Sequence, residues 1–293
     1  MIMENKCLTI TYLTKASYAS LNGSDKETDN ISSIKKIKMS DGNEYPYKSS
    51  QAVRRDIREQ LAVLGWELSK TVVAKQAKGA SSTMGKPEQY IDDDLFGFMI
   101  ADKDTNKRTG PVRVSPLIAL DKYLGELDFA TNYMGVKVGG NINIFETEIH
   151  SGFYRGTILV ELDRVGIADS DTYKLALNQD EKIKRVSALV DAIQNLWGIG
   201  RQSRFLADIS PKFICAALMK VKNPIYMECL RIVHGNCIDE TLIKATENDF
   251  KNQISKSVMG ERKGFFGKDI QNAKPLGEAF DEIRTWVRET YRH

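Results

Sequence analysis

Most of the chain alternates short apolar stretches with polar ones, and the spacing of the apolar residues separates strands from helices. Residues 6–13 alternate around β-branched side chains and predict a strand, which runs into a polar loop at 20–30. Two short segments around Asp41 and Gly42 predict a β-hairpin, since this dipeptide is typical of a two-residue turn. The chain is therefore expected to open with strands.

Helices are expected where apolar residues recur every three or four positions. Ser49 or Ser50 can cap a helix from 51 to about 64, because a serine oxygen accepts the first unpaired backbone N–H groups. Residues 179–197 form an amphipathic helix whose apolar stripe is Ile183, Val186, Leu189, Val190 and Ile193. Further helices are predicted at 116–125, at 239–254 with Asp239 as the cap, and at 275–291 with Pro275 at its start.

The remaining segments indicate the fold class. Residues 69–94 are polar and small without a sustained period, which predicts an irregular insertion. Residues 143–166 predict a long hairpin divided at Ser151 and Gly152, and residues 212–221 predict a buried strand. Strands and helices are mixed, without the regular alternation of a doubly wound sheet, and this favours an α+β fold.

Composition narrows the function little. The 293 residues are 42% hydrophobic and 28% charged, and the net charge of +3 does not by itself indicate a nucleic-acid binder. The four cysteines show no metal or redox spacing, so reduced structural thiols are expected. The N-terminus does not resemble a signal peptide, and no apolar run approaches the ~18 residues of a membrane span. The cytoplasm is the expected location, with no membrane partner.

Local clustering of basic residues is more informative, first on the predicted helix at 51–64. At about 100° per residue, one arc of this helix is apolar, with Val53, Ile57, Leu61 and Leu64. The opposite arc carries Gln51, Arg54, Arg55 and Arg58. Guanidinium groups beside a helix N-terminus are suited to phosphate. The alternative is a solvated charged face that pairs with Asp56 and Glu59.

A second basic segment is the loop GIGRQSRFLADISP, residues 198–211. Its glycines permit close approach of a ligand, its polar side chains suit a phosphodiester backbone, and an aromatic ring could stack on a base. The residues concerned are Arg201, Gln202, Ser203, Arg204 and Phe205. Alternatively, Gly198 and Gly200 end the preceding helix and the ring belongs to the core.

Other candidates carry weaker signals. Lys107, Arg108 and Arg113 bracket one turn, and His150, Tyr154 and Arg155 surround Ser151 and Gly152; each group could contact RNA or form an ordinary surface loop. Asp92, Asp93 and Asp94 could hold a divalent cation, but a capping or loop role is favoured. No histidine accompanies a nucleophile motif, and no dinucleotide or phosphate-loop fingerprint occurs. The sequence therefore predicts phosphate contacts, without an enzyme activity, a cofactor or a metal.

Six segments in one order resemble a known family. They are SLNGSD, YKSSQAVRRDIRE, DDLFGFM, KRTGPVRVSPLIAL, ETEIHSGFYRGTILVELDRVG and GRQSRFLADISP. Together they are similar to the Cas-seven family of CRISPR proteins, in its DevR-type, type I-B-like branch, over about residues 6–222. No single segment is specific, and the last seventy residues match less clearly.

The resemblance implies a modified RRM or ferredoxin-like palm. It implies a single domain over 1–293, with a finger insertion at about 66–110 and a thumb at about 133–155. Such proteins polymerise head-to-tail along CRISPR guide RNA, which then pairs with target DNA; other copies of the chain and other Cascade subunits are expected partners. The RNA-facing residues that the resemblance implies are Asn22, Ser24, Lys48, Ser49, Ser50, Gln51, Arg54, Arg55, Arg58 and Arg201 to Phe205.

Two departures from the family pattern matter. Thr9, Thr11 and Tyr12 stand where an RRM would place stacking aromatics, so base stacking on the sheet is not expected. Related subunits cleave RNA through a thumb aspartate that has no match here, so nuclease activity is not expected. The rival hypotheses are a metal-dependent ribonuclease that uses Asp92 to Asp94, and a free nucleic-acid-binding autoregulator.

Overall fold

Two long antiparallel strands form the centre of the computed structural model, which describes residues 4–23, 31–73, 81–100, 106–134, 139–169, 173–198 and 202–292. Strand β1 (Cys7–Ala19) pairs with β13 (His150–Glu161) along almost its whole length. The strand predicted at 6–13 is thus confirmed and is longer than expected. Ser24 and Arg201 lie outside the described residues.

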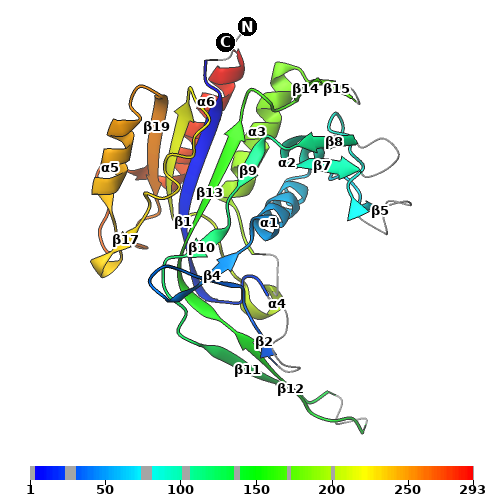
Figure 1. The fold of residues 1–293 in the computed structure, drawn as a ribbon, viewed down its shortest axis with the longest axis vertical. Helices are drawn as coiled ribbons and strands as arrows, with labels where there is room; N and C mark the ends of the chain where they lie inside the picture. Colours follow the sequence, from blue (N-terminus) through cyan, green and yellow to red (C-terminus); the bar gives the residue numbers. More distant parts are fainter. Residues whose placement is uncertain are drawn as a thin grey trace.

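The described residues build a nine-stranded sheet around this pair, in the order β20-β19-β16-β1-β13-β10-β4-β3, with β9 also paired to β13 (Figure 1). Neighbours are antiparallel except β19 and β20. The added strands are β3 (Lys36–Lys38), β4 (Glu44–Lys48), β9 (Val112–Val114), β10 (Leu117–Ala119), β16 (Phe213–Met219), β19 (Ile254–Glu261) and β20 (Lys274–Pro275).

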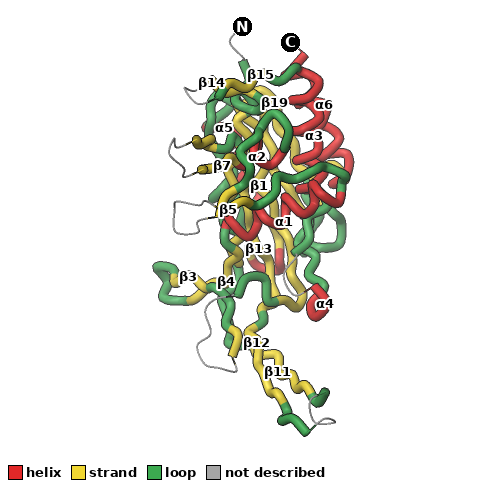
Figure 2. The backbone as a smooth tube through the Cα atoms, turned by 90° about the vertical axis from the view of Figure 1, so that its right-hand side faces the viewer, coloured by secondary structure: helices red, strands yellow, loops and turns green. Residues whose placement is uncertain are grey.

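Smaller sheets extend from this body. A hairpin of β11 (Leu127–Asn132) and β12 (Asn143–Glu148), with β2 (Ile31–Ser32) alongside, projects well away from the main sheet in both views (Figures 1 and 2). The two-stranded pairs are β5 (Val72–Val73) with β6 (Ser81–Ser82), β7 (Gly97–Ile100) with β8 (Asn106–Thr109), β14 (Ile167–Asp169) with β15 (Lys174–Ala176), and β17 (Ile232–Val233) with β18 (Cys237–Ile238).

Helices cover both faces of the main sheet unequally. Three long ones, α1 (Ser50–Val63), α3 (Gln179–Gln194) and α6 (Leu276–Arg292), lie together on one face (Figure 2). The other face is covered by α5 (Glu240–Asp249) and the surrounding loops. The short helices are α2 (Ile91–Phe96), α4 (Gln202–Phe205) and a 3-10 turn at His234–Asn236. None of the helices described is long and apolar enough to cross a membrane.

Because both faces are covered, the central strands are buried on both sides. In β16, Ile214 and Ala216 pack toward the three long helices, whereas Phe213 and Cys215 pack toward α5. This explains why the sequence of residues 212–221 contains a continuous run of apolar residues and does not alternate between apolar and polar ones. Thr9 and Thr11 of β1 are buried as well. The sheet face that an RRM offers to RNA is therefore closed along β1.

The α+β class and most of the predicted elements are confirmed. The predicted hairpin at Asp41 and Gly42 joins β3 and β4. The helices predicted at 51–64, 179–197, 239–254 and 275–291 are α1, α3, α5 and α6. Asp239 caps α5 as expected, accepting hydrogen bonds from the backbone N–H groups of Thr241 and Leu242 at 3.1 and 3.3 Å.

Two predicted elements are wrong because long-range pairing decides their structure. Residues 116–125 form strand β10 and a turn instead of a helix, since β13 and β4 flank them. Residues 143–166 do not form one hairpin: β12 pairs with β11 and β2, and Ser151 and Gly152 lie inside β13. Gly152 serves close packing, because a Cβ there would lie 2.6 Å from Asp121 Oδ2. Leu64, expected in the core, is exposed.

The division into one palm with two insertions stays a prediction. Strands β5 to β8 fall within the range 66–110. The projecting hairpin overlaps the range 133–155 only in part, since β11 precedes it and β13 belongs to the central sheet.

Candidate nucleic-acid interface

The start of α1 is held in place by the loop that follows β1. Ser49 caps the helix: its Oγ accepts a hydrogen bond from the backbone N–H of Ala52 at 3.3 Å. The backbone N–H of Ser49 donates in turn to Asn22 Oδ1 at 2.8 Å. Two segments that the sequence singled out separately, at Asn22 and at residues 48–51, are thus brought together.

The exposed side of α1 keeps cationic donors available. Gln51 and Arg55 are exposed, and Arg54 is half-buried. Arg54 Nε is buried and has no hydrogen-bond partner among the residues that the structure describes, and the Arg54 side chain lines a cavity of about 360 Å³ with Phe98 and Arg113. This combination of a capped helix N-terminus and free guanidinium groups suits a chain of phosphates.

Arg58 and Lys48 have internal partners. Arg58 packs over the ring of Phe96 at 4.7 Å and pairs with Asp92 at 3.5 Å, and burial lowers the pKa of its guanidinium. Lys48 is buried and its Nζ lies 2.8 Å from Asp56 Oδ2. These two cations hold α1 against its neighbours. Asp56, which the alternative sequence interpretation paired with the surface arginines, is buried and pairs with Lys48.

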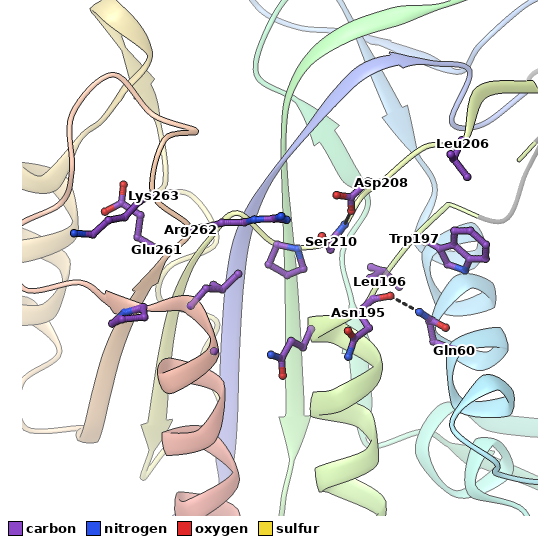
Figure 3. A pocket seen from close by; sticks show the side chains of 15 residues that line it. Gln60, Asn195, Leu196, Trp197, Leu206, Asp208, Ser210, Glu261, Arg262 and Lys263 are labelled. Atoms are coloured by element: carbon purple, nitrogen blue, oxygen red, sulfur yellow. Dashed lines mark hydrogen bonds between the residues drawn. The ribbon is translucent and has the colours of Figure 1, made fainter.

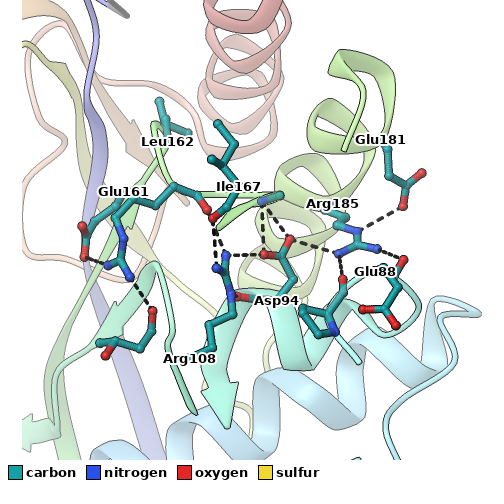
Figure 4. Close-up of polar contacts among 12 residues, drawn as sticks. Glu88, Asp94, Arg108, Glu161, Leu162, Ile167, Glu181 and Arg185 are labelled. Carbon is teal, nitrogen blue, oxygen red and sulfur yellow. Dashed lines mark hydrogen bonds and ion pairs between the residues drawn. The ribbon is translucent and has the colours of Figure 1, made fainter. Parts of the chain in front are cut away.

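Arg108 belongs to a buried network (Figure 4). Asp94 lies between Arg108 and Arg185, with Oδ1 at 2.5 Å from Arg108 Nη2 and Oδ2 at 3.0 Å from Arg185 Nη1. Arg108 also donates to the carbonyl oxygens of Asp94, Arg164 and Ile167. Its donors are used inside the protein, so its position does not fit the predicted RNA contact.

The acidic run at 92–94 lies in α2 and is buried. Asp92 Oδ1 accepts the backbone N–H of Ser69, and Asp93 Oδ2 accepts that of Lys86, at 3.0 and 2.8 Å. The three carboxylates thus bind loops and arginines in different directions. Among the described residues, no group of three or more His, Cys, Asp or Glu side chains could hold a metal ion.

Arg113 lies on β9 with its side chain half-exposed and ion-paired. Its Nη2 is 2.7 Å from Glu161 Oε1, and Glu161 also accepts hydrogen bonds from Arg164 and Lys222. Part of the Arg113 guanidinium remains accessible, because 52% of its side chain is exposed. An ion pair with Glu161 therefore competes with any phosphate contact here.

Glu161→Gln is expected to remove a pH-dependent stabilisation. Burial acts to raise the pKa of Glu161, but hydrogen bonds from Lys222, Arg113 and Arg164 prevail and lower it from 4.5 to about 2. Because the folded-state pKa is depressed, the stabilisation is full above the ordinary pKa and is lost as pH falls toward 2. Urea unfolding at about pH 7 and about pH 3 should show a stability gap between variant and wild type that narrows in acid. A gap of equal size at both pH values would contradict this.

The candidates at the start of β13 are also engaged internally. His150 and Tyr154 are buried, with Nδ1 and the hydroxyl 2.8 Å apart, and burial lowers the pKa of His150. Arg155 points to the other face of the sheet, where it pairs with Glu228 at 2.8 Å and donates to the carbonyl of Leu230. All three side chains thus have partners within the protein.

The basic loop at 198–211 is attached to the projecting hairpin. Gln202 and Ser203 lie in α4, and Figures 1 and 2 both place this helix between α1 and the hairpin. Arg204 pairs with Asp128 of β11, and the ring of Phe205 lies 5.6 Å from that of Tyr18. The loop thus lies near the end of β1, and its described arginine is paired with the hairpin.

A cavity of about 840 Å³ lies between the ends of α1 and α3 and the start of α6 (Figure 3). Trp197 stands on one side, and Arg262 and Lys263 stand on the other. The side-chain amide of Gln60 donates to the carbonyl of Asn195 across its floor. The lining mixes amides, cations and an indole with the hydroxyl of Ser210 and the carboxylates of Asp208 and Glu261.

Comparisons with known proteins agree with the resemblance drawn from the six segments. A chain from a structure described as a CRISPR RNA-guided surveillance complex has a TM-score of 0.60 and 17% identity, covering 96% of this chain and 99% of that one. A chain from such a complex described as pre-nicking has a TM-score of 0.64 and 13% identity, covering 96% and 100%. At these identities the likeness is one of fold.

No curated protein matches the sequence. The family model described as CRISPR-associated negative auto-regulator DevR/Csa2 matches residues 10–241, which is most of the chain. This range contains all six segments from which the resemblance was drawn. The chain belongs to the CRISPR-associated DevR/Csa2 family.

Proposed function

We propose that the chain is a non-catalytic, RNA-binding backbone subunit of a CRISPR surveillance complex. In this proposal it grips the backbone of the guide RNA, lies head-to-tail with further copies, and presents the guide for pairing with target DNA in antiviral defence. The observation that carries it is the start of α1, where a capped N-terminus and two arginines without carboxylate partners among the described residues lie on one surface. Family membership and the fold of the surveillance-complex chains support it.

The chemistry of this surface suits a phosphodiester chain. Backbone N–H groups at a helix start carry partial positive charge, and guanidinium forks bind phosphate oxygens in pairs. Such contacts do not depend on sequence, which leaves the bases free to pair with a target. The residues that we assign to the interface are Asn22, Ser49, Ser50, Gln51, Arg54 and Arg55, while RNA contacts by Ser24, Arg201, Gln202 and Ser203 stay predictions.

The proposal contains no catalytic step. The clustered carboxylates that could have bound a metal, Asp92 to Asp94, are used by backbone amides and arginines. Release of the Asp94 carboxylate for a cation would leave the buried Arg108 without this counter-charge and would remove one of the two carboxylates that pair with Arg185, which is costly.

RNA-length-dependent assembly tests the proposal. Purified protein mixed with single-stranded RNAs of increasing length should form particles whose mass, measured by light scattering, grows stepwise with length. Binding should weaken steeply with salt, because each neutralised phosphate of a single strand contributes about −0.7 to the logarithmic slope. A particle of constant mass on all RNAs would favour a free regulator instead. RNA cleavage that needs Mg²⁺ and is lost in Asp93→Asn would favour the nuclease.

A further inference from the structure

Arg204 contacts both strands of the projecting hairpin at its base. Its Nη2 pairs with Asp128 of β11, and its Nη1 donates to Thr147 Oγ1 of β12 at 3.2 Å. The guanidinium also lies 4.9 Å from the ring of Phe145 and 5.2 Å from that of Phe205. The Asp128 carboxylate accepts a second hydrogen bond from the hydroxyl of Tyr18, at the end of β1. One arginine thus links α4 to the hairpin, with the end of β1 as a second anchor.

The opposite face of the hairpin base is fixed by another ion pair. The register places Glu148 beside Leu127, on the face away from Asp128 and Thr147. Glu148 lies 2.7 Å from Lys36 Nζ and accepts the backbone N–H of Ile34 at 2.8 Å. The base is therefore held from both faces. Farther out, Phe129 and Ile144 are exposed on the Leu127 face.

We propose that Arg204 is a positioning residue that fixes the direction in which the β11–β12 hairpin projects, and that it does not bind guide-RNA phosphate. A two-stranded hairpin is marginally stable alone, so its orientation depends on such anchors. Both terminal nitrogens of Arg204 bond with the hairpin, so a phosphate would have to compete with Asp128 for the guanidinium. The inference rests on the proposed function, in which copies repeat head-to-tail. A heterologous contact that repeats along an assembly requires the hairpin to project at the same angle in every copy.

Loss of this anchor should leave the folded body intact. The pair is partly exposed, with 27% of the Arg204 and 22% of the Asp128 side chain accessible, and such pairs contribute little to global stability. Variants at these positions can therefore be compared as folded proteins. Circular dichroism and the melting temperature check this for each one.

The direct test measures hairpin orientation in the free protein. Spin labels are placed at the exposed positions Thr131→Cys of β11 and Glu59→Cys of α1, with Cys237→Ser to remove the partly exposed thiol. Arg204→Ala and Asp128→Asn should each broaden the distance distribution. The conservative Arg204→Lys should broaden it less, and Arg204→Asp combined with Asp128→Arg should narrow it again. A distribution that stays unchanged in Arg204→Ala and Asp128→Asn would overturn the proposal.

RNA binding separates positioning from phosphate contact. On an RNA long enough for one copy only, Arg204→Ala should change the affinity by less than about twofold, whereas assembly on a long RNA should weaken by about tenfold or more. Loss of short-RNA affinity as large as that of Arg55→Ala would identify Arg204 as a phosphate ligand and overturn the proposal. If the wild type bound no RNA, the proposed function would fail, and the spin-label distances would still decide the role of Arg204.

Discussion

Asp94→Asn is expected to destabilise the protein by about 3–5 kcal/mol, the cost of removing one partner from a buried ion pair. The Asp94 side chain is fully buried, and its two arginine partners are each 2% exposed. Its oxygens also accept the backbone N–H of Gly166 at 3.1 Å. An asparagine keeps the shape but leaves the buried Arg108 guanidinium without its carboxylate and leaves Arg185 paired with the more exposed Glu181. Its NH₂ group also faces other donors.

In urea unfolding, this loss should appear as a transition midpoint at a lower urea concentration, while the slope of unfolding free energy against urea concentration stays unchanged. Glu289→Gln provides a matched control, because it neutralises one partner of an exposed pair with Lys256, whose side chains are 43% and 47% accessible. The control should change stability by less than about 1 kcal/mol. A loss for Asp94→Asn no larger than that of the control would show that the network of Figure 4 does not hold α2 to α3.

The network also shows why part of the fold could not be predicted from the sequence. Arg185 lies in a helix whose apolar stripe was predicted correctly, and nothing nearby distinguishes it from a surface arginine. Its buried partner Asp94 is 91 positions earlier in the chain. Local patterns determine where a helix begins and which stripe is apolar, as in α3 and α5, whereas a buried ion pair requires knowledge of which elements meet.

The same limit explains the failed elements. Residues 116–125 contain good helix formers, yet Leu120 donates its backbone N–H to Phe153 and Ser115 bonds with Thr157, so the sheet edge determines their structure. Local propensity is a weak prior where a strand edge can be paired. By contrast, the arginine face of α1 depends only on helical geometry, and the structure leaves Arg55 exposed and Arg54 half-buried, opposite the buried Val53 and Ile57.

For the candidate site, the sequence identified cations but not their partners. Four of the predicted cations form ion pairs inside the protein: Lys48, Arg58, Arg108 and Arg155. The partner of Lys48, Asp56, is only eight residues away, whereas the other three carboxylates lie farther away in the sequence. Asp128 and Tyr18, which anchor the hairpin, carried no local signal at all. A cluster of basic residues therefore marks a candidate surface, and only the contacts separate its accessible members from its structural ones.

Arg54→Ala combined with Arg55→Ala is expected to weaken single-stranded RNA binding by about 100-fold at low salt, at about 1.5 kcal/mol for each charge-assisted contact. No ion pair joins either arginine to a carboxylate among the described residues, and Arg55 is exposed while Arg54 is half-buried. Fluorescence anisotropy across a salt series should show the slope of log affinity against log salt falling by about 1.4, since two phosphate contacts are lost.

The control for this double variant is Arg288→Ala with Arg292→Ala, which removes the same charge from the exposed side of α6. It should leave both affinity and salt slope nearly unchanged, because net charge alone does not create a phosphate site. The loss in Arg54→Ala with Arg55→Ala should also be equal for RNAs of different sequence, since backbone contacts do not read bases. Equal losses in the α1 and α6 variants would mean that RNA responds to overall charge, and the start of α1 would lose its role as the interface.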